Sequence, residues 1–438
     1  MGKQLIITGA KLFLGIDESV IEDGAVWIDG DIIKYAGPAA AMGDADPSIE
    51  TIDVGGQFVM PGMSECHAHL SFTDGSPFEL GSPTPESATI SAVRSSRIML
   101  GSGFTSALSF GSVHKVDITL REAINAGTIP GPRLAAAGKD LGVTASNVDS
   151  GGTGGLSQIT DGPWNLRQAV RQQRYLNVDI VKIFIDGEGV SNHAPRDELA
   201  FHDDEVAAIV DEAHRRNMKV ATHSRSAAGV KQAVRAGCDY IGHANFLDDE
   251  AIDVLSEARD RIFVGPGIAW EMGLVNHHAS IGLTREWVTD RGYDEQIEAS
   301  IKSVGMMLKA DIRMMVGGDY GISIAPHGTY AKDLEMFVDM FGMTPGKALL
   351  CATRDGGAAA DPKGRVGTLE AGKFADLVIV NGDPIADIKV LQDHSKLSAI
   401  IKGGVIYRDL VNDMTFEIKA ADIAGQGAGA DKVLEPAQ

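Results

Sequence analysis

The segment FVMPGMSECHAH, residues 58–69, places two histidines one residue apart, shortly after an apolar run. Residues 58–60 predict a short buried strand, and Pro61-Gly62 marks a turn. In extended backbone, residues i and i+2 point to the same side, so the imidazoles of His67 and His69 converge and suit one metal ion. Such a pair also arises by chance or on a protein surface, and its place beyond a strand strengthens the metal interpretation.

Apolar segments of this kind recur along the chain from residue 58, with helix-like stretches between most of them. The clearest helix is 203–217, where Val206, Ile209, Val210 and Ala213 share one face. This alternation predicts an α/β protein with a (β/α)₈ TIM barrel, a doubly wound open sheet being the alternative. No phosphate-binding glycine loop follows a strand. The eight predicted strands are 58–60, 104–110, 133–138, 179–186, 219–224, 240–246, 262–268 and 313–319.

Both ends of the chain have a different sequence pattern, in which short apolar segments are separated by glycine-containing turns. They lie at 4–7, 24–28, 32–35 and 51–54, and again at 375–380 and 397–407. We predict a small β-sandwich domain formed by both ends, residues 1–60 plus 360–418. The barrel, residues 61–359, is inserted between them. Residues 419–438 lack periodicity and are predicted to be a mobile tail.

Composition limits the partners of the protein. Of 438 residues, 39 are Lys or Arg and 60 are Asp or Glu, which gives a net charge of −21. Nucleic acid and anionic membranes need a basic surface and are therefore excluded as general partners. Three widely spaced cysteines exclude a disulfide scaffold and favour a reducing cytoplasm. We expect a small-molecule substrate, no membrane span and a homo-oligomer.

Three further polar residues end predicted barrel strands, namely His223, His243 and Asp319. Active sites of (β/α)₈ barrels lie at the carboxyl ends of the strands. Each residue alone can be a hydrogen-bonded strand end. Together with His67 and His69, these residues provide the imidazole and carboxylate ligands that zinc and similar divalent metals prefer.

Lys182 lies inside the most apolar predicted strand, 179–186. Burying a charged lysine there is costly, so the amine either reaches an edge, pairs with a carboxylate, or loses its proton. A neutral amine can react with carbon dioxide. The resulting carboxylated lysine is an anionic bridge between two metals.

These features resemble the amidohydrolase superfamily. The resemblance is carried by residues 59–69, 181–183 and 366–378 and by His223, His243 and Asp319, and it extends to about residue 410. Within the superfamily the chain is similar to the branch of imidazolonepropionase-like proteins, metal-dependent Xaa-Pro dipeptidases and ochratoxinase-type amidases. A bridging lysine is absent from the mononuclear deaminase branch, so Lys182 argues against that branch.

The resemblance implies two divalent metal ions, with zinc expected, bridged by carboxylated Lys182 and a hydroxide. It also implies that Asp319 accepts the hydroxide proton and passes it to the leaving nitrogen, as general base and then acid. The implied ligands of one metal are His67, His69 and Asp319, and those of the other are His223 and His243.

Four residues are candidates for substrate contact. Arg225, two residues after His223, suits a substrate carboxylate, with a surface ion pair as the alternative. Tyr320 follows the last ligand and either donates to a substrate oxygen or packs. His327 and His193 lie on loops after the strands of Asp319 and Lys182, and each either binds substrate or supports a ligand.

The leading hypothesis is a binuclear metal hydrolase that cleaves the C–N bond of an N-acyl amino acid, a dipeptide or an ochratoxin-like amide. Two other hydrolytic reactions remain open, on phenylurea or carbamate xenobiotics and on cyclic amides. A metal-binding scaffold without turnover is the non-enzymatic alternative.

Overall fold

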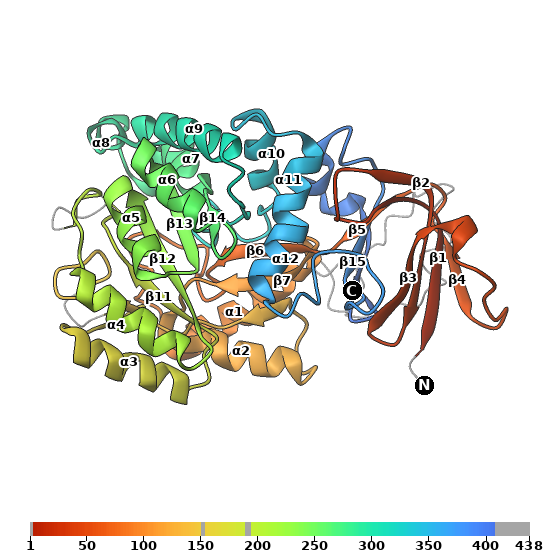
Figure 1. The fold of residues 1–438 in the computed structure, drawn as a ribbon, viewed down its shortest axis with the longest axis horizontal. Helices are drawn as coiled ribbons and strands as arrows, with labels where there is room; N and C mark the ends of the chain where they lie inside the picture. The colour runs from red at the N-terminus through yellow and green to blue at the C-terminus, as the bar shows by residue number, and fades with distance from the viewer. Residues whose placement is uncertain (1–2, 150–153, 189–193, 408–438) are drawn as a thin grey trace, which may run out of the picture.

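The computed structural model describes residues 3–149, 154–188 and 194–407, and Figure 1 shows strands from both chain ends beside an α/β barrel. One eight-stranded sheet has the order β17-β16-β15-β5-β1-β2-β3, with β4 paired to β1. The prediction that both chain ends build one β-sandwich sheet is confirmed. Its strands are β1 Gln4–Phe13, β2 Val20–Asp29, β3 Ile32–Pro38, β4 Glu50–Asp53, β5 Phe58–Pro61, β15 Leu377–Val380, β16 Leu397–Lys402 and β17 Val405–Tyr407.

The sandwich has an apolar core of its own, made by residues from strands far apart in the sequence. Ile7, Val26, Val59, Leu377 and Ile401 all belong to it and are fully buried. β-Branched and leucine side chains suit this role because they pack well on a pleated surface. The core therefore ties the C-terminal strands to the N-terminal ones.

The barrel strands run parallel, and the predicted TIM barrel is confirmed. β6 pairs with β7 and β7 with β8, while β11, β12, β13 and β14 pair in sequence. Two short strands, β9 and β10, add to the edge of β11. The bounds are β6 Met63–Ala68, β7 Phe104–Ser109, β8 Arg133–Ala135, β9 Asp140–Gly142, β10 Ser157–Ile159, β11 Ile180–Phe184, β12 Lys219–Ser226, β13 Tyr240–Phe246 and β14 Phe263–Gly265.

Residues 58–60 were predicted as the first barrel strand, although the predicted sandwich segment 1–60 also included them. The barrel-strand prediction was wrong. This run forms β5, which pairs antiparallel with β15 and parallel with β1 in the sandwich sheet. The first barrel strand is β6, which begins at Met63, beyond the Pro61-Gly62 turn. The apolar run is buried in both cases, so its pattern alone does not reveal which sheet it joins.

The eighth barrel position is held by an extended segment, residues 313–316, with little regular pairing. The Val264 amide donates to the Arg313 carbonyl at 3.0 Å, and the Met315 amide donates to the Val264 carbonyl at 2.9 Å. On its other side the Cys66 amide donates to the Val316 carbonyl at 3.0 Å. These bonds close the barrel between β14 and β6.

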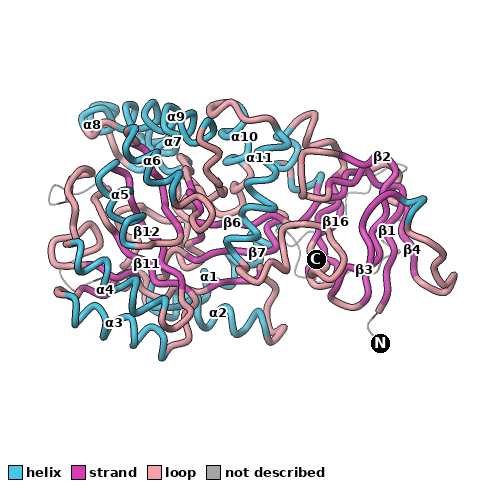
Figure 2. The backbone as a smooth tube through the Cα atoms, viewed as in Figure 1, coloured by secondary structure: helices cyan, strands magenta, loops and turns pink. Residues whose placement is uncertain are grey.

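Helices surround the barrel strands in the tube view of Figure 2. The predicted helix 203–217 corresponds to α4, which buries Val206, Ile209, Val210 and Ala213 as expected. No helix of the described residues is long and apolar enough to cross a membrane. The helices are α1 Pro85–Gly101, α2 Val116–Asn125, α3 Pro163–Tyr175, α4 Asp203–His214, α5 Ala227–Ala236, α6 Asp249–Glu257, α7 Ala269–His277, α8 Arg285–Asp290, α9 Tyr293–Lys309, α10 Lys332–Asp339, α11 Pro345–Leu350 and α12 Gly356–Ala360.

The sandwich joins the barrel through a partly buried ion pair. Arg133, on β8, donates to both carboxylate oxygens of Asp376 at 2.7 and 3.0 Å, just before β15. The guanidinium also lies 3.8 Å from the ring centroid of Phe374. Of the predicted domain segments, the tail 419–438 lies outside the described residues.

Candidate metal centre

The structure brings the six predicted ligands to the carboxyl ends of the barrel strands. Neighbouring strands set their spacing, because Phe184 is the register partner of His223 and Ser224 is the partner of His243. The elements that carry the ligands are β6 for His67 and its end for His69, β11 for Lys182, β12 for His223, β13 for His243 and the loop after 313–316 for Asp319.

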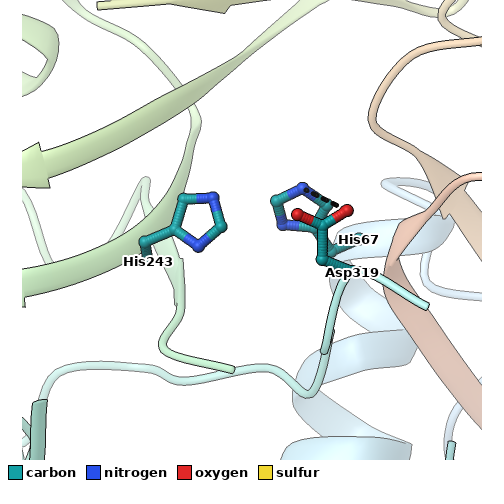
Figure 3. Close-up of side chains that lie close together, drawn as sticks. All are labelled: His67, His243 and Asp319. Atoms are coloured by element: carbon teal, nitrogen blue, oxygen red, sulfur yellow. Dashed lines mark ion pairs between the residues drawn. The ribbon is translucent and has the colours of Figure 1, made fainter. Parts of the chain in front are cut away.

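The imidazoles and the aspartate converge. The ring centroids of His67 and His243 are 4.9 Å apart, and those of His223 and His243 are 4.4 Å apart. Asp319 Oδ1 lies 3.1 Å from His69 Nε2 and 3.9 Å from His67 Nε2. Figure 3 shows Asp319 beside His67, with His243 across from both, and ligand atoms of these three residues lie within 4.8 Å of one another.

Two of these residues have an unusual backbone. His243 has a φ of 73° and Asp319 a φ of 62°, in the left-handed region that non-glycine residues rarely adopt. Gly317 allows the Asp319 segment to approach β6, because a Cβ at this glycine would lie only 2.7 Å from the His67 Cβ. Such strain persists where the surrounding fold fixes it, which is common at functional sites.

Burial holds the imidazoles in the form that binds metals. It lowers the pKa of His67, His223 and His243 well below the ordinary value, so these rings are neutral at pH 7. His69 donates from Nδ1 to the Gly111 carbonyl at 3.0 Å, so Nε2, which faces Asp319 Oδ1, is the nitrogen available to a metal.

Lys182 is fully buried and its Nζ has no hydrogen-bond partner among the described residues. The amine lies 4.6 Å from the Phe110 ring centroid and 4.8 Å from that of Phe184. Burial lowers the pKa of Lys182 to about 8. Of the predicted alternatives, neither an edge position nor a carboxylate within ion-pair distance is found in the described part of the chain.

The donor set therefore fits a metal centre. In addition to Lys182 Nζ, the His67 Nδ1 and His243 Nε2 atoms are buried without a hydrogen-bond partner among the described residues. Unpaired buried nitrogens of this kind are costly unless a ligand satisfies them. A divalent cation is the ligand that neutral imidazoles and a carboxylate favour.

A cavity of about 280 Å³ opens beside these residues. His67, His69, His223 and Asp319 form its polar floor. Its apolar wall consists of Phe72, Phe78, Leu80, Val148, Leu156, Phe184 and Trp270.

Two acidic residues of the cavity wall, Asp140 and Glu188, were not predicted. Glu188 Oε2 lies 3.3 Å from His223 Nε2, and the two residues form a second cluster with His243. Asp140 is fully buried and neither carboxylate oxygen has a hydrogen-bond partner in the described residues. Both follow the ends of predicted barrel strands, so the strand-end argument used for His223 applies to them as well.

Arg225 does not reach the cavity. Its guanidinium is fully buried and donates from Nε and Nη2 to both oxygens of Glu188. Nη1 donates to Asn245 at 2.8 Å and to Glu271. The predicted contact between Arg225 and a substrate carboxylate is therefore wrong. Glu188, and not Arg225, lines the cavity, and Glu188 accepts hydrogen bonds from the guanidinium. The predicted alternative of a surface ion pair is also wrong.

Two other predicted substrate contacts have internal partners. The Tyr320 hydroxyl donates to Asp333 Oδ1 at 2.9 Å, and Tyr320 is not among the described residues that line the cavity. His327 donates from Nε2 to the Phe72 carbonyl at 3.1 Å, and its Nδ1 lies 2.8 Å from the Tyr330 hydroxyl. Both are buried. The fourth residue, His193, lies outside the described residues.

A family comparison identifies the fold and the chemistry together. The sequence model of the amidohydrolase family matches residues 58–407. The chain belongs to the amidohydrolase family. It is accordingly a metal-dependent hydrolase that acts on C–N bonds of small molecules, and the predicted resemblance is confirmed.

Amidohydrolases of the predicted branch are similar to it over most of their length. Ochratoxinase of Aspergillus niger is 27% identical over 435 residues, 92% of this chain and 87% of that protein. The crystal structure of A. niger ochratoxinase has a TM-score of 0.82 at 26% identity and covers 93% of this chain and 96% of that one. A Xaa-Pro dipeptidase with methionine bound in its active site has a TM-score of 0.82 at 29% identity, covering 92% of this chain and 100% of that chain. Imidazolonepropionase of Rhizobium rhizogenes is 22% identical over 403 residues, 84% of this chain and 89% of that protein.

Proposed function

We propose that the protein is a binuclear amidohydrolase that hydrolyses the amide bond of an N-acyl amino acid, a dipeptide or an ochratoxin-like compound. The observation that carries this proposal is the convergence of imidazoles, Asp319 and the unpartnered Lys182 beside one cavity. The similarity to an ochratoxinase and to a Xaa-Pro dipeptidase supports an amide substrate.

The proposed assignment keeps two metal positions. His67, His69 and Asp319 would hold one ion, and His223 and His243 would hold the other. Zinc suits this nitrogen-rich set. Bound divalent metals polarise a carbonyl and lower the pKa of water from 15.7 to about 7.

Lys182 is proposed to be carboxylated and to bridge the two positions. Its buried amine needs either a counter-ion or the loss of its charge, and the neighbouring Phe110 and Phe184 rings provide no carboxylate. Carboxylation converts a buried cation without a partner into an anion that metals satisfy. The neutral imidazoles do not supply a bridging anion, so the lysine completes the donor set.

Asp319 is proposed to move the proton. Its Oδ1 lies 3.1 Å from His69 Nε2 and the residue lines the cavity, so the carboxylate would lie close both to the residues that would hold the metals and to a substrate in the cavity. There it takes a proton from the attacking water and delivers it to the leaving nitrogen. The aromatic wall excludes water and holds an apolar acyl or leaving group.

The test combines metal analysis with a small substrate panel. The purified protein is expected to contain two metal ions per chain and to hydrolyse N-acyl amino acids or dipeptides in preference to phenylureas, carbamates and lactams. Preferred turnover of a urea or a lactam would assign one of the other hydrolytic reactions. Two metals with no turnover on any class would favour the scaffold alternative and contradict the proposal.

A further inference from the structure

The described cavity wall carries three carboxylates and no basic side chain other than histidine. Asp140, Glu188 and Asp319 line it, and none of the described lining residues is Lys or Arg. Two runs outside the described residues adjoin the wall along the chain, SGGT at 150–153 and GVSNH at 189–193, and neither contains Lys or Arg in the sequence. Fixed positive charge from side chains is therefore scarce around this cavity.

Two of the three carboxylates already have partners. Asp319 lies 3.1 Å from His69 Nε2. Glu188 accepts hydrogen bonds from the guanidinium of Arg225, which also donates to Glu271, so the donors of this arginine are occupied. It cannot offer a free cation to a substrate.

Asp140 differs from both. Its side chain is fully buried, both carboxylate oxygens lack a hydrogen bond, and no ion pair forms within 4.0 Å in the described part of the chain. Lys182 and His69 are the positive or ionisable groups that act on it, while Asp319 and Asp117 repel it. Burial raises the pKa of Asp140 to about 7, which reflects the cost of an unpaired buried charge.

Lys182 does not neutralise the carboxylate of Asp140. Its Nζ is also without a partner in the described residues, so the two groups do not form an ion pair. In the proposed function the lysine becomes an anion that binds the metals. The two metal ions are assigned to the imidazoles, Asp319 and this lysine, so neither of them is assigned to Asp140. An unpaired carboxylate in a cavity wall is a binding group for an ammonium.

We propose that Asp140 binds an ammonium group of the substrate and selects amides whose acyl part carries a free amine over the same amides with that amine acylated. This inference rests on the proposed amide hydrolysis and narrows its substrates to dipeptides and related aminoacyl amides. The Phe72, Phe184 and Trp270 rings of the same wall accommodate the apolar remainder and favour a nearby cation.

The experiment compares L-alanyl-L-phenylalanine with N-acetyl-L-alanyl-L-phenylalanine in the metal-loaded enzyme. We expect wild type to prefer the free amine in kcat/KM by about tenfold or more, as one charge-assisted hydrogen bond provides. Asp140→Asn should lower kcat/KM for the free amine alone and remove this preference. The matched control Asp53→Asn removes the same charge from the sandwich sheet and should change neither value. An equal loss on both substrates in Asp140→Asn would overturn the proposal and assign Asp140 to the metal centre.

A binding measurement separates this inference from the proposed function. Benzylamine and benzyl alcohol have similar shapes, differ in charge at pH 7.5, and contain no amide. Calorimetry should show tighter binding of benzylamine to wild type, and a loss of this preference in Asp140→Asn with metal content unchanged. That result supports Asp140 as the ammonium site even if neither dipeptide is hydrolysed, an outcome that would contradict only the proposed function. Equal benzylamine affinity in wild type and Asp140→Asn would overturn the inference.

If Asp140→Asn loses its metals, Asp140→Glu provides the second test. It keeps the charge, so a folded, metal-loaded Asp140→Glu protein should still bind benzylamine more tightly than benzyl alcohol. Equal affinities would show that Asp140 supports the metal centre instead.

Discussion

The two ends of the barrel are both rich in charged residues. Among the described residues, the carboxyl end pairs some of them, such as Arg225 with Glu188, but leaves two buried groups without a partner. At the amino ends of the strands, Arg121 contacts Asp179 at 2.5 Å, and Lys219 and His214 contact Asp239 at 2.7 and 2.8 Å. At the carboxyl ends, Lys182 Nζ and the carboxylate of Asp140 are buried without partners among the described residues.

This difference suggests that the paired charged groups stabilise the fold, whereas the unpaired ones serve binding and catalysis. Paired groups lower the cost of burying charge and fix the strand ends, whereas unpaired groups leave that cost unmet until a ligand arrives. Substitutions at the amino end should therefore change stability, and those at the carboxyl end should change metal binding and turnover.

The largest effect is expected for Lys182→Ala. Loss of the proposed bridging group should remove most bound metal and lower kcat/KM by about 10⁴-fold or more, since a metal lowers the pKa of water by about nine units. Metal analysis and steady-state kinetics measure both changes. Lys402 provides a control, because it is a half-buried lysine whose Nζ donates to the Gly131 carbonyl. Lys402→Ala should keep its metals and turnover, and an active Lys182→Ala protein would exclude the bridging role.

Asp319→Asn should have the next largest effect. The amide keeps the size of the side chain but cannot accept the proton, so kcat should fall by about 10²- to 10⁴-fold. Circular dichroism and thermal unfolding should show an intact fold. Undiminished kcat would place the proton transfer on another group.

Strand ends could be predicted because their chemistry is local. The HxH pair at His67 and His69 and the polar ends at His223, His243 and Asp319 are visible in short stretches of sequence. The parallel barrel follows from the alternation of strands and helices. These features depend on neighbouring residues, so a single sequence is sufficient to reveal them.

Features that depend on distant partners could not be predicted. Residues 58–60 join the sandwich because they pair with β15, far along the chain, and nothing in that apolar run specifies the partner. Arg225 is buried because Glu188 and Glu271 arrive from other elements. Its sequence neighbourhood gives no sign of this pairing, which is why it was assigned to the substrate.

Arg133→Met tests the pairing that links the barrel to the sandwich. Asp376 is almost fully buried, and losing the bidentate guanidinium should lower the free energy of unfolding by about 2 kcal/mol. The effect is below that of a fully buried pair because Arg133 is partly exposed and the Gly403 amide still donates to Asp376 Oδ1 at 2.7 Å. Urea denaturation measures the loss, while kcat and metal content should stay at wild-type values. Normal stability with reduced turnover would remove the distinction between the two ends.

Tyr320→Phe should have the smallest effect. It tests whether a hydrogen-bonded residue acts only on stability even when it is the neighbour of a proposed catalytic residue, Asp319. The hydroxyl donates to Asp333 Oδ1, and Asp333 Oδ2 accepts from the Gly317 amide at 3.0 Å, so Tyr320 helps to hold the loop that carries Asp319. Removing one hydrogen bond should lower the free energy of unfolding by about 1 kcal/mol and leave KM within about twofold, because Asp333 keeps its backbone partner. A raised KM with unchanged stability would instead show that the hydroxyl contacts substrate, as the sequence alone allowed.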